Sequence, residues 1–182
     1  MRPTSPRWLT NMRLLLLLLV LCARTAFADG LTGTFPSIDG GTLALEDWRG
    51  QPVLVVNTAS QCGYTYQYEG MQSLYDRYRN KGLIVLAIPS DDFNQELNSA
   101  ADVKDFCMIT FGLDLPMTDI THVKGNQAHP FFKSVKDRIS FVPQWNFNKI
   151  LIGPDGEIMG TWRSNTPPES PEIVDLIETT LD

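Results

Sequence analysis

The stretch Pro52-Val-Leu-Val-Val-Asn-Thr-Ala-Ser-Gln-Cys-Gly-Tyr-Thr65 joins an apolar run to a polar, cysteine-bearing turn. The uninterrupted apolar run over residues 52–57 is typical of a strand that is covered on both faces. Apolar and aromatic residues then recur at helical spacing over residues 68–78, and residues 83–88 form a second apolar run of strand length. The stretch therefore predicts a strand-helix-strand unit in which Cys62 lies between the first strand and the helix.

The rest of the chain continues the alternation of strands and helices. A short strand is expected over residues 42–45, helices over 99–111 and 130–136, strands over 147–153 and 157–163, and a final helix from residue 171. An additional strand between the two middle helices is left open. This order predicts an α/β fold with a central mixed sheet flanked by helices on both faces. The final antiparallel hairpin fits a thioredoxin-like sheet better than a dinucleotide-binding one, and no glycine-rich phosphate motif follows a strand.

Residues 1–28 have the pattern of a secretory signal peptide. Three arginines precede or open the apolar run that ends at residue 21, and Ala26-Phe-Ala28 is a small-x-small cleavage motif. The run is about half the length of a membrane span. We therefore expect cleavage after Ala28, a domain over residues 29–182, export to the periplasm or the exterior, and no stable membrane insertion after cleavage. An uncleaved amino-terminal anchor is the alternative, and Met12 is an alternative start.

The charge of the expected mature chain restricts its partners. Four of the 15 basic residues but none of the 21 acidic residues lie within residues 1–28, so the remaining 154 residues carry a net charge of −10. Such a chain repels nucleic acid and anionic lipid surfaces, which excludes nucleic-acid binding. The spacing of its two histidines and two cysteines matches no usual zinc site, and we expect no metal and no cofactor.

Cys62 is the first candidate for chemistry. At a strand-to-helix turn, the exposed N–H groups of the helix amino end favour a thiolate, which is the reactive form of cysteine. Its polar and glycine-containing surroundings predict partial exposure. The alternatives are a buried cysteine that packs as a small apolar group and a structural disulfide with Cys107.

A series of short motifs links this turn to the rest of the chain. In order they are Asn57-Thr-Ala-Ser-Gln-Cys-Gly-Tyr-Thr65, Gln67-Tyr-Glu-Gly-Met-Gln-Ser-Leu-Tyr75, Gly82-Leu-Ile-Val-Leu-Ala-Ile-Pro89, Phe93, Gln95-Glu96, Phe106-Cys107, Ala128-His-Pro130 and Trp145-Asn-Phe-Asn-Lys149. Together these motifs resemble those of the glutathione peroxidase family and span nearly all of the expected mature chain. The resemblance implies a thioredoxin-like fold, which agrees with the predicted order of elements.

The resemblance also implies an activity and a set of site residues. Cys62 corresponds to the peroxidatic cysteine, and Gln95, Trp145 and Asn146 correspond to its catalytic partners. Cys107 aligns with the resolving cysteine of the thioredoxin-dependent members, although its helix face also fits a plain core position. Amide and indole N–H groups near the sulfur stabilise a thiolate and the leaving oxygen of a peroxide.

The expected reaction is the reduction of hydrogen peroxide or of organic and lipid hydroperoxides, with a thioredoxin-like protein or glutathione as reductant. The tract between Pro130 and Trp145 is short, as in monomeric family members, so we expect a monomer. No basic cluster that fits glutathione is evident. A thiol-disulfide oxidoreductase is the alternative, against which the absence of a Cys-x-x-Cys pair counts, and a binding module with a degenerate site is a third interpretation.

One loop departs from the family pattern. Residues 89–97 are one residue shorter than the family loop, and Asp91 and Asp92 replace amide residues there. This change displaces Gln95 by about one backbone step, roughly 3.5 Å. A carboxylate that points toward Cys62 opposes formation of the thiolate. The preferred alternative is that Phe93 anchors the loop while both carboxylates face solvent.

Overall fold

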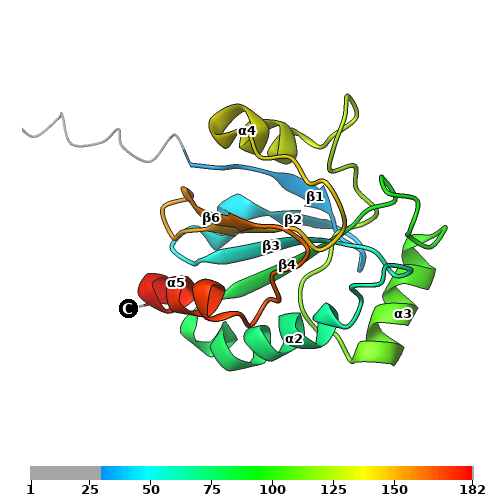
Figure 1. Cartoon of the computed structure of the whole chain (residues 1–182), viewed down its shortest axis with the longest axis horizontal. Coiled ribbons are helices and arrows are strands. Elements are labelled where there is room, and N and C mark those ends of the chain that lie inside the picture. Colours follow the sequence, from blue (N-terminus) through cyan, green and yellow to red (C-terminus); the bar gives the residue numbers. More distant parts are fainter. Residues whose placement is uncertain (1–29, 182) are drawn as a thin grey trace, which may run out of the picture.

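The computed structural model describes residues 30–181, so the predicted signal peptide and its cleavage site lie outside the described residues. At its centre is a four-stranded sheet in the order β4-β3-β5-β6 (Figure 1). The strands are β3 (Val53–Thr58), β4 (Ile84–Pro89), β5 (Lys149–Ile152) and β6 (Ile158–Trp162). Strand β3 runs parallel to β4 and antiparallel to β5, and β6 returns antiparallel to β5. The predicted mixed sheet is confirmed.

Helices cover both faces of this sheet. Helices α2 (Gln67–Tyr78) and α5 (Pro171–Leu181) lie on one side, and α4 (Pro130–Ile139) lies on the other (Figure 1). Helix α3 (Ala100–Phe111) packs into the same core as α2 through Val103 and Cys107. Short 3-10 helices also occur: η1 (Leu45–Trp48) follows β2 (Thr42–Ala44), and η2 (Arg79–Lys81) follows α2. The predicted helix-covered α/β architecture is therefore correct on both faces.

Two features near the amino end differ from the sequence-based expectation. Strand β1 (Thr34–Pro36) was not predicted, because three residues are too few to show a period of two. It pairs with β2 (Thr42–Ala44) in a separate hairpin, so the predicted strand at 42–45 lies outside the central sheet. The strand left open between α3 and α4 is reduced to isolated bridges, Ala87 with Met117 and Ser37 with Thr118.

The helix ends agree with local chemistry. Gly82 follows α2 and η2 with φ 111°, a left-handed conformation that glycine adopts without steric cost. Helix α3 begins behind Ser99, whose hydroxyl accepts a hydrogen bond from the Asp102 N–H, and ends at Gly112 with φ 63°. Pro130 occupies the first turn of α4. These signals explain why the helix positions were predictable to within a few residues.

The sheet separates two buried clusters. One lies among β3, α2, α3 and α5, and includes Tyr68, Met71 and Ile173; both described cysteines belong to it. The other lies between the sheet, the β1–β2 hairpin and α4, and includes Phe35 and Phe131. None of the helices within residues 30–181 is both long and apolar enough to span a bilayer.

Candidate active site

Cys62 lies in the turn that joins the end of β3 to the start of α2. Its carbonyl accepts a hydrogen bond from the Thr65 N–H at 3.1 Å, and its Sγ accepts one from the Tyr64 N–H at 3.5 Å. The turn exposes Gln61 and Gly63 but directs the sulfur inward. Cys62 is only 4% exposed, so the predicted partial exposure is wrong: polar neighbours in the sequence do not fix the direction of a side chain within a turn.

A second loop is bonded to this turn. The Gln61 N–H donates to the Gln95 carbonyl at 2.9 Å, and the Ser60 N–H donates to the Glu96 carboxylate at 2.9 Å. Glu96 is buried, and its other carboxylate oxygen has no hydrogen-bond partner among the described residues. Burial raises the pKa of the Glu96 carboxyl, although hydrogen bonds from Ser60 and Leu97 act in the opposite direction. The hydrogen bond to the Gln95 carbonyl and the hydrogen bond to the Glu96 carboxylate together hold Gln95 beside the Cys62 turn.

The segment before β5 completes the site. The Asn146 side-chain N–H donates to Gln95 Oε1 at 3.1 Å, so the structure brings these two predicted residues together. Asn146 is fully buried and its Oδ1 has no partner among the described residues. From the role that the family resemblance implies, the Asn146 side chain is expected to point into a solvent-accessible cleft, and this prediction is wrong. Trp145 is 40% exposed and its ring lies 5.5 Å from that of Phe93, so it is not a core aromatic.

An open cavity of about 430 Å³ lies beside these segments. Its walls include Trp145 and also Tyr64, whose N–H bonds the Cys62 sulfur. Cys62, Gln95 and Asn146 do not line this cavity, so it adjoins the site through Trp145 and Tyr64.

Buried amides hold the Trp145–Asn146 segment in place. The Trp145 carbonyl accepts hydrogen bonds from the side chains of Asn57 at 3.0 Å and Asn148 at 2.8 Å. The Ser164 hydroxyl donates to the Asn146 carbonyl at 2.6 Å. Sequence reasoning missed these supporting roles; the only signal was that polar residues end the apolar run at Asn57 and occur in the Trp-Asn-Phe-Asn motif.

Phe147 shows how firmly this segment is held. Its φ of 61° lies in the left-handed region, which is unfavourable for a bulky residue. Its N–H donates to the Asn57 carbonyl at 2.5 Å, and its side chain is fully buried. Such conformations persist where the surroundings over-determine them, and they cluster at functional sites.

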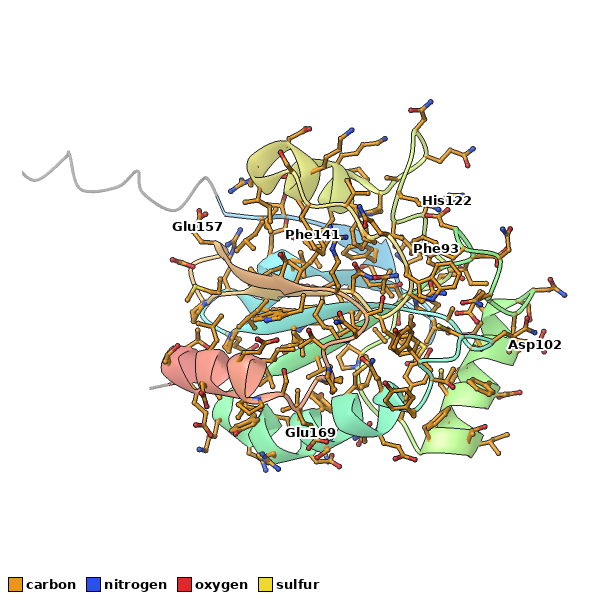
Figure 2. All side chains as sticks on the ribbon, in the orientation of Figure 1. Phe93, Asp102, His122, Phe141, Glu157 and Glu169 are labelled. Carbon is orange, nitrogen blue, oxygen red and sulfur yellow. The ribbon has the colours of Figure 1, made fainter. Side chains whose placement is uncertain are left out.

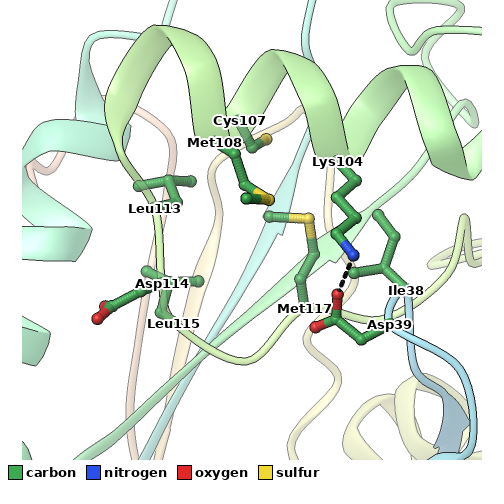
Figure 3. A pocket seen from close by; sticks show the side chains of 9 residues that line it. All are labelled: Ile38, Asp39, Lys104, Cys107, Met108, Leu113, Asp114, Leu115 and Met117. Atoms are coloured by element: carbon green, nitrogen blue, oxygen red, sulfur yellow. Dashed lines mark ion pairs between the residues drawn. The ribbon is translucent and has the colours of Figure 1, made fainter.

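Cys107 lies on α3 and is fully buried; both Cys107 and Cys62 are free thiols. Burial raises the pKa of the Cys107 thiol to about 11, although the neighbouring Tyr68 hydroxyl acts in the opposite direction. A cavity of about 260 Å³ lies beneath this part of α3, lined by Cys107, Met108 and Met117 and edged by an ion pair between Lys104 and Asp39 (Figure 3). Burial therefore favours the protonated thiol of Cys107 in this structure.

The two substituted acids of the shortened loop have different roles. Asp91 is an exposed residue whose carboxylate accepts the Glu96 N–H at 3.1 Å, and Asn94 takes a left-handed φ of 54° that tightens the loop. In this shortened loop the Gln95 side chain accepts a hydrogen bond from Asn146.

Asp92 is not solvent-facing, so the preferred expectation is wrong for this residue. Its side chain is 10% exposed and accepts hydrogen bonds from the N–H groups of Val123 at 2.6 Å and Lys124 at 3.0 Å. Asp92 Oδ1 also lies 2.7 Å from His122 Nδ1. His122 and Phe93, the residue that follows Asp92 in the chain, are both labelled in Figure 2. Burial acts to raise the Asp92 pKa, but these bonds outweigh it, so the pKa lies below its ordinary value. Asp92 therefore anchors the 122–124 loop.

Within residues 30–181, no group of three or more histidine, cysteine or acidic side chains is placed to hold a metal ion.

Comparisons with known proteins decide the family. The sequence model of glutathione peroxidases matches residues 32–136. The chain is 37% identical over 156 residues to the hydroperoxy fatty acid reductase gpx1 of Synechocystis sp., covering 80% of this chain and 91% of the relative. It is 30% identical over 176 residues to the thioredoxin/glutathione peroxidase BtuE of Escherichia coli, covering 83% and 96%. The chain belongs to the glutathione peroxidase family.

Solved structures agree with this assignment. The crystal structure described as Trgpx in apo form has a TM-score of 0.65 and 32% identity, and covers 86% of this chain and 96% of its own. A thiol:disulfide interchange protein from Chlorobium tepidum reaches a TM-score of 0.63, but at 16% identity that likeness shows the thioredoxin fold alone. The chain is thus a thiol peroxidase of the glutathione peroxidase family on a thioredoxin fold.

Proposed function

We propose that Cys62 is the peroxidatic residue and that Gln95, Trp145 and Asn146 assist it. The observation that carries this assignment is the hydrogen bond between Asn146 and Gln95, together with the bond from Gln61 to the Gln95 backbone. These contacts support a single site beside the Cys62 turn, formed by three segments that are far apart in the sequence.

The proposed first step is nucleophilic. The Cys62 thiolate attacks the terminal oxygen of the hydroperoxide, the S–O bond forms as the O–O bond breaks, and the leaving alkoxide takes up a proton. The sulfur becomes a sulfenic acid and the peroxide becomes water or an alcohol. The unpartnered Asn146 Oδ1 accepts a hydrogen bond from the terminal O–H, while the Trp145 indole N–H stabilises the leaving oxygen.

Cys107 is the proposed resolving residue. Its thiol displaces the hydroxyl of the sulfenic acid, which forms the Cys62–Cys107 disulfide and releases water. Helix α3 must open for this step, because Cys107 is fully buried. Within α3 only Val103 and Cys107 are buried, and Met108 and Ile109 are exposed. Opening must therefore expose Val103 and Cys107 and also separate the partly buried Phe111 from Tyr68.

The proposed substrates are hydrogen peroxide and organic or lipid hydroperoxides, and the proposed reductant is a thioredoxin-like protein, with glutathione as the alternative. The names of the relatives from Synechocystis and Escherichia coli support these classes. We further propose that the mature protein spans residues 29–182, is monomeric, and is exported after cleavage behind Ala28. The signal-like sequence supports export.

The test distinguishes the peroxidatic role of Cys62 from the resolving role of Cys107. We expect Cys62→Ser to abolish peroxide reduction, and Cys107→Ser to retain one stoichiometric round, with the sulfenic acid trapped and identified by mass spectrometry. Thioredoxin-coupled turnover should stop in Cys107→Ser. Normal thioredoxin-dependent cycling of Cys107→Ser would exclude the resolving role and favour glutathione. Expression of the full chain in a bacterium, followed by fractionation and amino-terminal sequencing, tests export and the expected start at Asp29.

A further inference from the structure

Lys149 is a fully buried cation with no carboxylate partner among the described residues. It is the first residue of β5, and its side chain is 0% exposed. Its Nζ donates to Gln67 Oε1, to the Phe147 carbonyl at 2.8 Å and to the Thr166 carbonyl at 2.6 Å. An ammonium group has three N–H donors, and each of them has one acceptor here. The surroundings therefore fit the protonated side chain.

The three acceptors belong to different segments. Gln67 is the first residue of α2, which follows the Cys62 turn, and its side-chain N–H also donates to the Ser164 carbonyl at 2.7 Å. Phe147 follows Asn146 directly and has the unfavourable left-handed backbone described above. Thr166 lies in the segment between β6 and α5. One side chain thus connects the start of α2 to the segment that carries Trp145 and Asn146.

We propose that the protonated Lys149 is a positioning residue for the oxidation of Cys62, and that loss of its proton loosens the Trp145–Phe147 segment and slows the reaction with peroxide. This inference rests on the function proposed above. Lys149 acts only through the residues that it holds.

The neutral side chain cannot reproduce these contacts. An uncharged amine has two N–H donors and one lone pair, so one of the three oxygen acceptors must face that lone pair. The repulsion falls on Gln67, Phe147 or Thr166, and each of these contacts ties the catalytic segment to its neighbours.

The proton of Lys149 is also labile in the physiological range. Burial lowers the Lys149 pKa to about 7, and no charged side chain of the described residues offsets this effect. The groups that face the ammonium from α2, from the 145–148 segment and from the 163–170 segment are all neutral oxygen atoms. The wild-type rate of Cys62 oxidation should therefore fall as the pH rises through about 7 and Lys149 loses its proton.

The experiment measures the rate constant of Cys62 oxidation by hydrogen peroxide from pH 5.5 to 9, with rapid quenching and mass spectrometry. In Lys149→Met, we expect the rate at pH 6.5 to be about 10- to 100-fold lower, because a small displacement of positioned groups has that effect, and the alkaline fall to be absent. Lys136→Met, on the exposed face of α4, is the matched control and should follow the wild-type profile.

If Lys149→Met does not fold, a second variant tests the role of Lys149 independently. Gln67→Glu is isosteric and puts a carboxylate beside the ammonium, at the expense of one hydrogen bond to Ser164. A neighbouring opposite charge raises a lysine pKa, so the alkaline fall should move upward by at least about one pH unit.

Three results would overturn the role of Lys149, and a fourth would overturn the proposed function. A wild-type rate that does not fall above pH 7, or an alkaline fall unchanged in Gln67→Glu, overturns the role of Lys149. A Lys149→Met protein that folds and reacts within twofold of the wild type at pH 6.5 also overturns it. If Cys62 of the wild type is not oxidised at any pH, the proposed function itself fails.

Discussion

The opening of α3 can be tested by weakening the helix at a point that does not touch either cysteine. Ser99 caps α3: its hydroxyl accepts the Asp102 N–H at 3.2 Å and donates to the Asp102 carboxylate at 2.7 Å. Replacing an N-cap serine with alanine costs about 1 kcal/mol. Since 1.4 kcal/mol corresponds to a factor of ten, the open population of α3 should increase about fivefold in Ser99→Ala.

If opening limits the resolution step, the rate of disulfide formation should rise by the same factor of about five. The assay adds one equivalent of peroxide, quenches with a thiol-alkylating reagent at successive times, and separates the sulfenic, disulfide and reduced forms by mass. Gly112→Ala at the other end of α3 should act in the same direction, because alanine at φ 63° is strained by about 1–2 kcal/mol. The preceding oxidation of Cys62, measured in the same time course, should not change.

A matched control removes a cap from a helix that carries no cysteine. His129 accepts the Phe131 N–H at 3.3 Å at the start of α4, so His129→Ala lowers stability without touching α3. Its rate of disulfide formation should equal that of the wild type. Unchanged rates in both Ser99→Ala and Gly112→Ala would refute the argument that α3 opening limits resolution. Equal acceleration in His129→Ala would instead assign the effect to global destabilisation.

Three further predictions concern buried polar groups. Asn146→Ala should slow oxidation of Cys62 by roughly 10²–10³-fold and also lower the melting temperature, because Asn146 is fully buried and bonded to Gln95; an unchanged rate with a large loss of stability would assign it a structural role. Asp92→Asn should cost about 1–2 kcal/mol near pH 7. Because the folded pKa of Asp92 is lowered, this cost should disappear as the pH falls below about 4, which thermal unfolding across pH measures. Glu96→Gln should raise the melting temperature at pH 8 more than at pH 4, because the folded pKa of Glu96 is raised and the stability linked to it is lost as the pH increases; an equal change at both pH values would contradict this.

Local patterns were sufficient to predict the order of the central strands and the helices. The apolar runs at 52–57 and 83–88 predicted strands covered on both faces, and β3 and β4 occur there. Helices α2, α3 and α5 occur where the apolar periodicity and the helix-end residues predicted them. These signals are readable because each depends on residues close together in the chain. The hairpin partner at 34–36 was missed because its pairing is with residues 42–44 and its own three residues carry no pattern.

The site residues came from motif resemblance, while their environments came only from the tertiary structure. The sequence identified Cys62, Gln95, Trp145 and Asn146, but it predicted the wrong exposure for Cys62 and Asn146 and the wrong environment for Asp92. Exposure depends on which distant segments pack over a side chain, and no local pattern records this.

The sequence by itself therefore determined the order of elements, the cysteine at a strand-to-helix turn, and the resemblance to a peroxidase family. The tertiary structure decided which atoms bond one another: Asn146 with Gln95, Asp92 with the 122–124 loop, and Lys149 with oxygen atoms from three segments. The physical reason is that periodicity and capping act over a few residues, whereas burial and hydrogen bonding between segments depend on the packed arrangement of the whole chain.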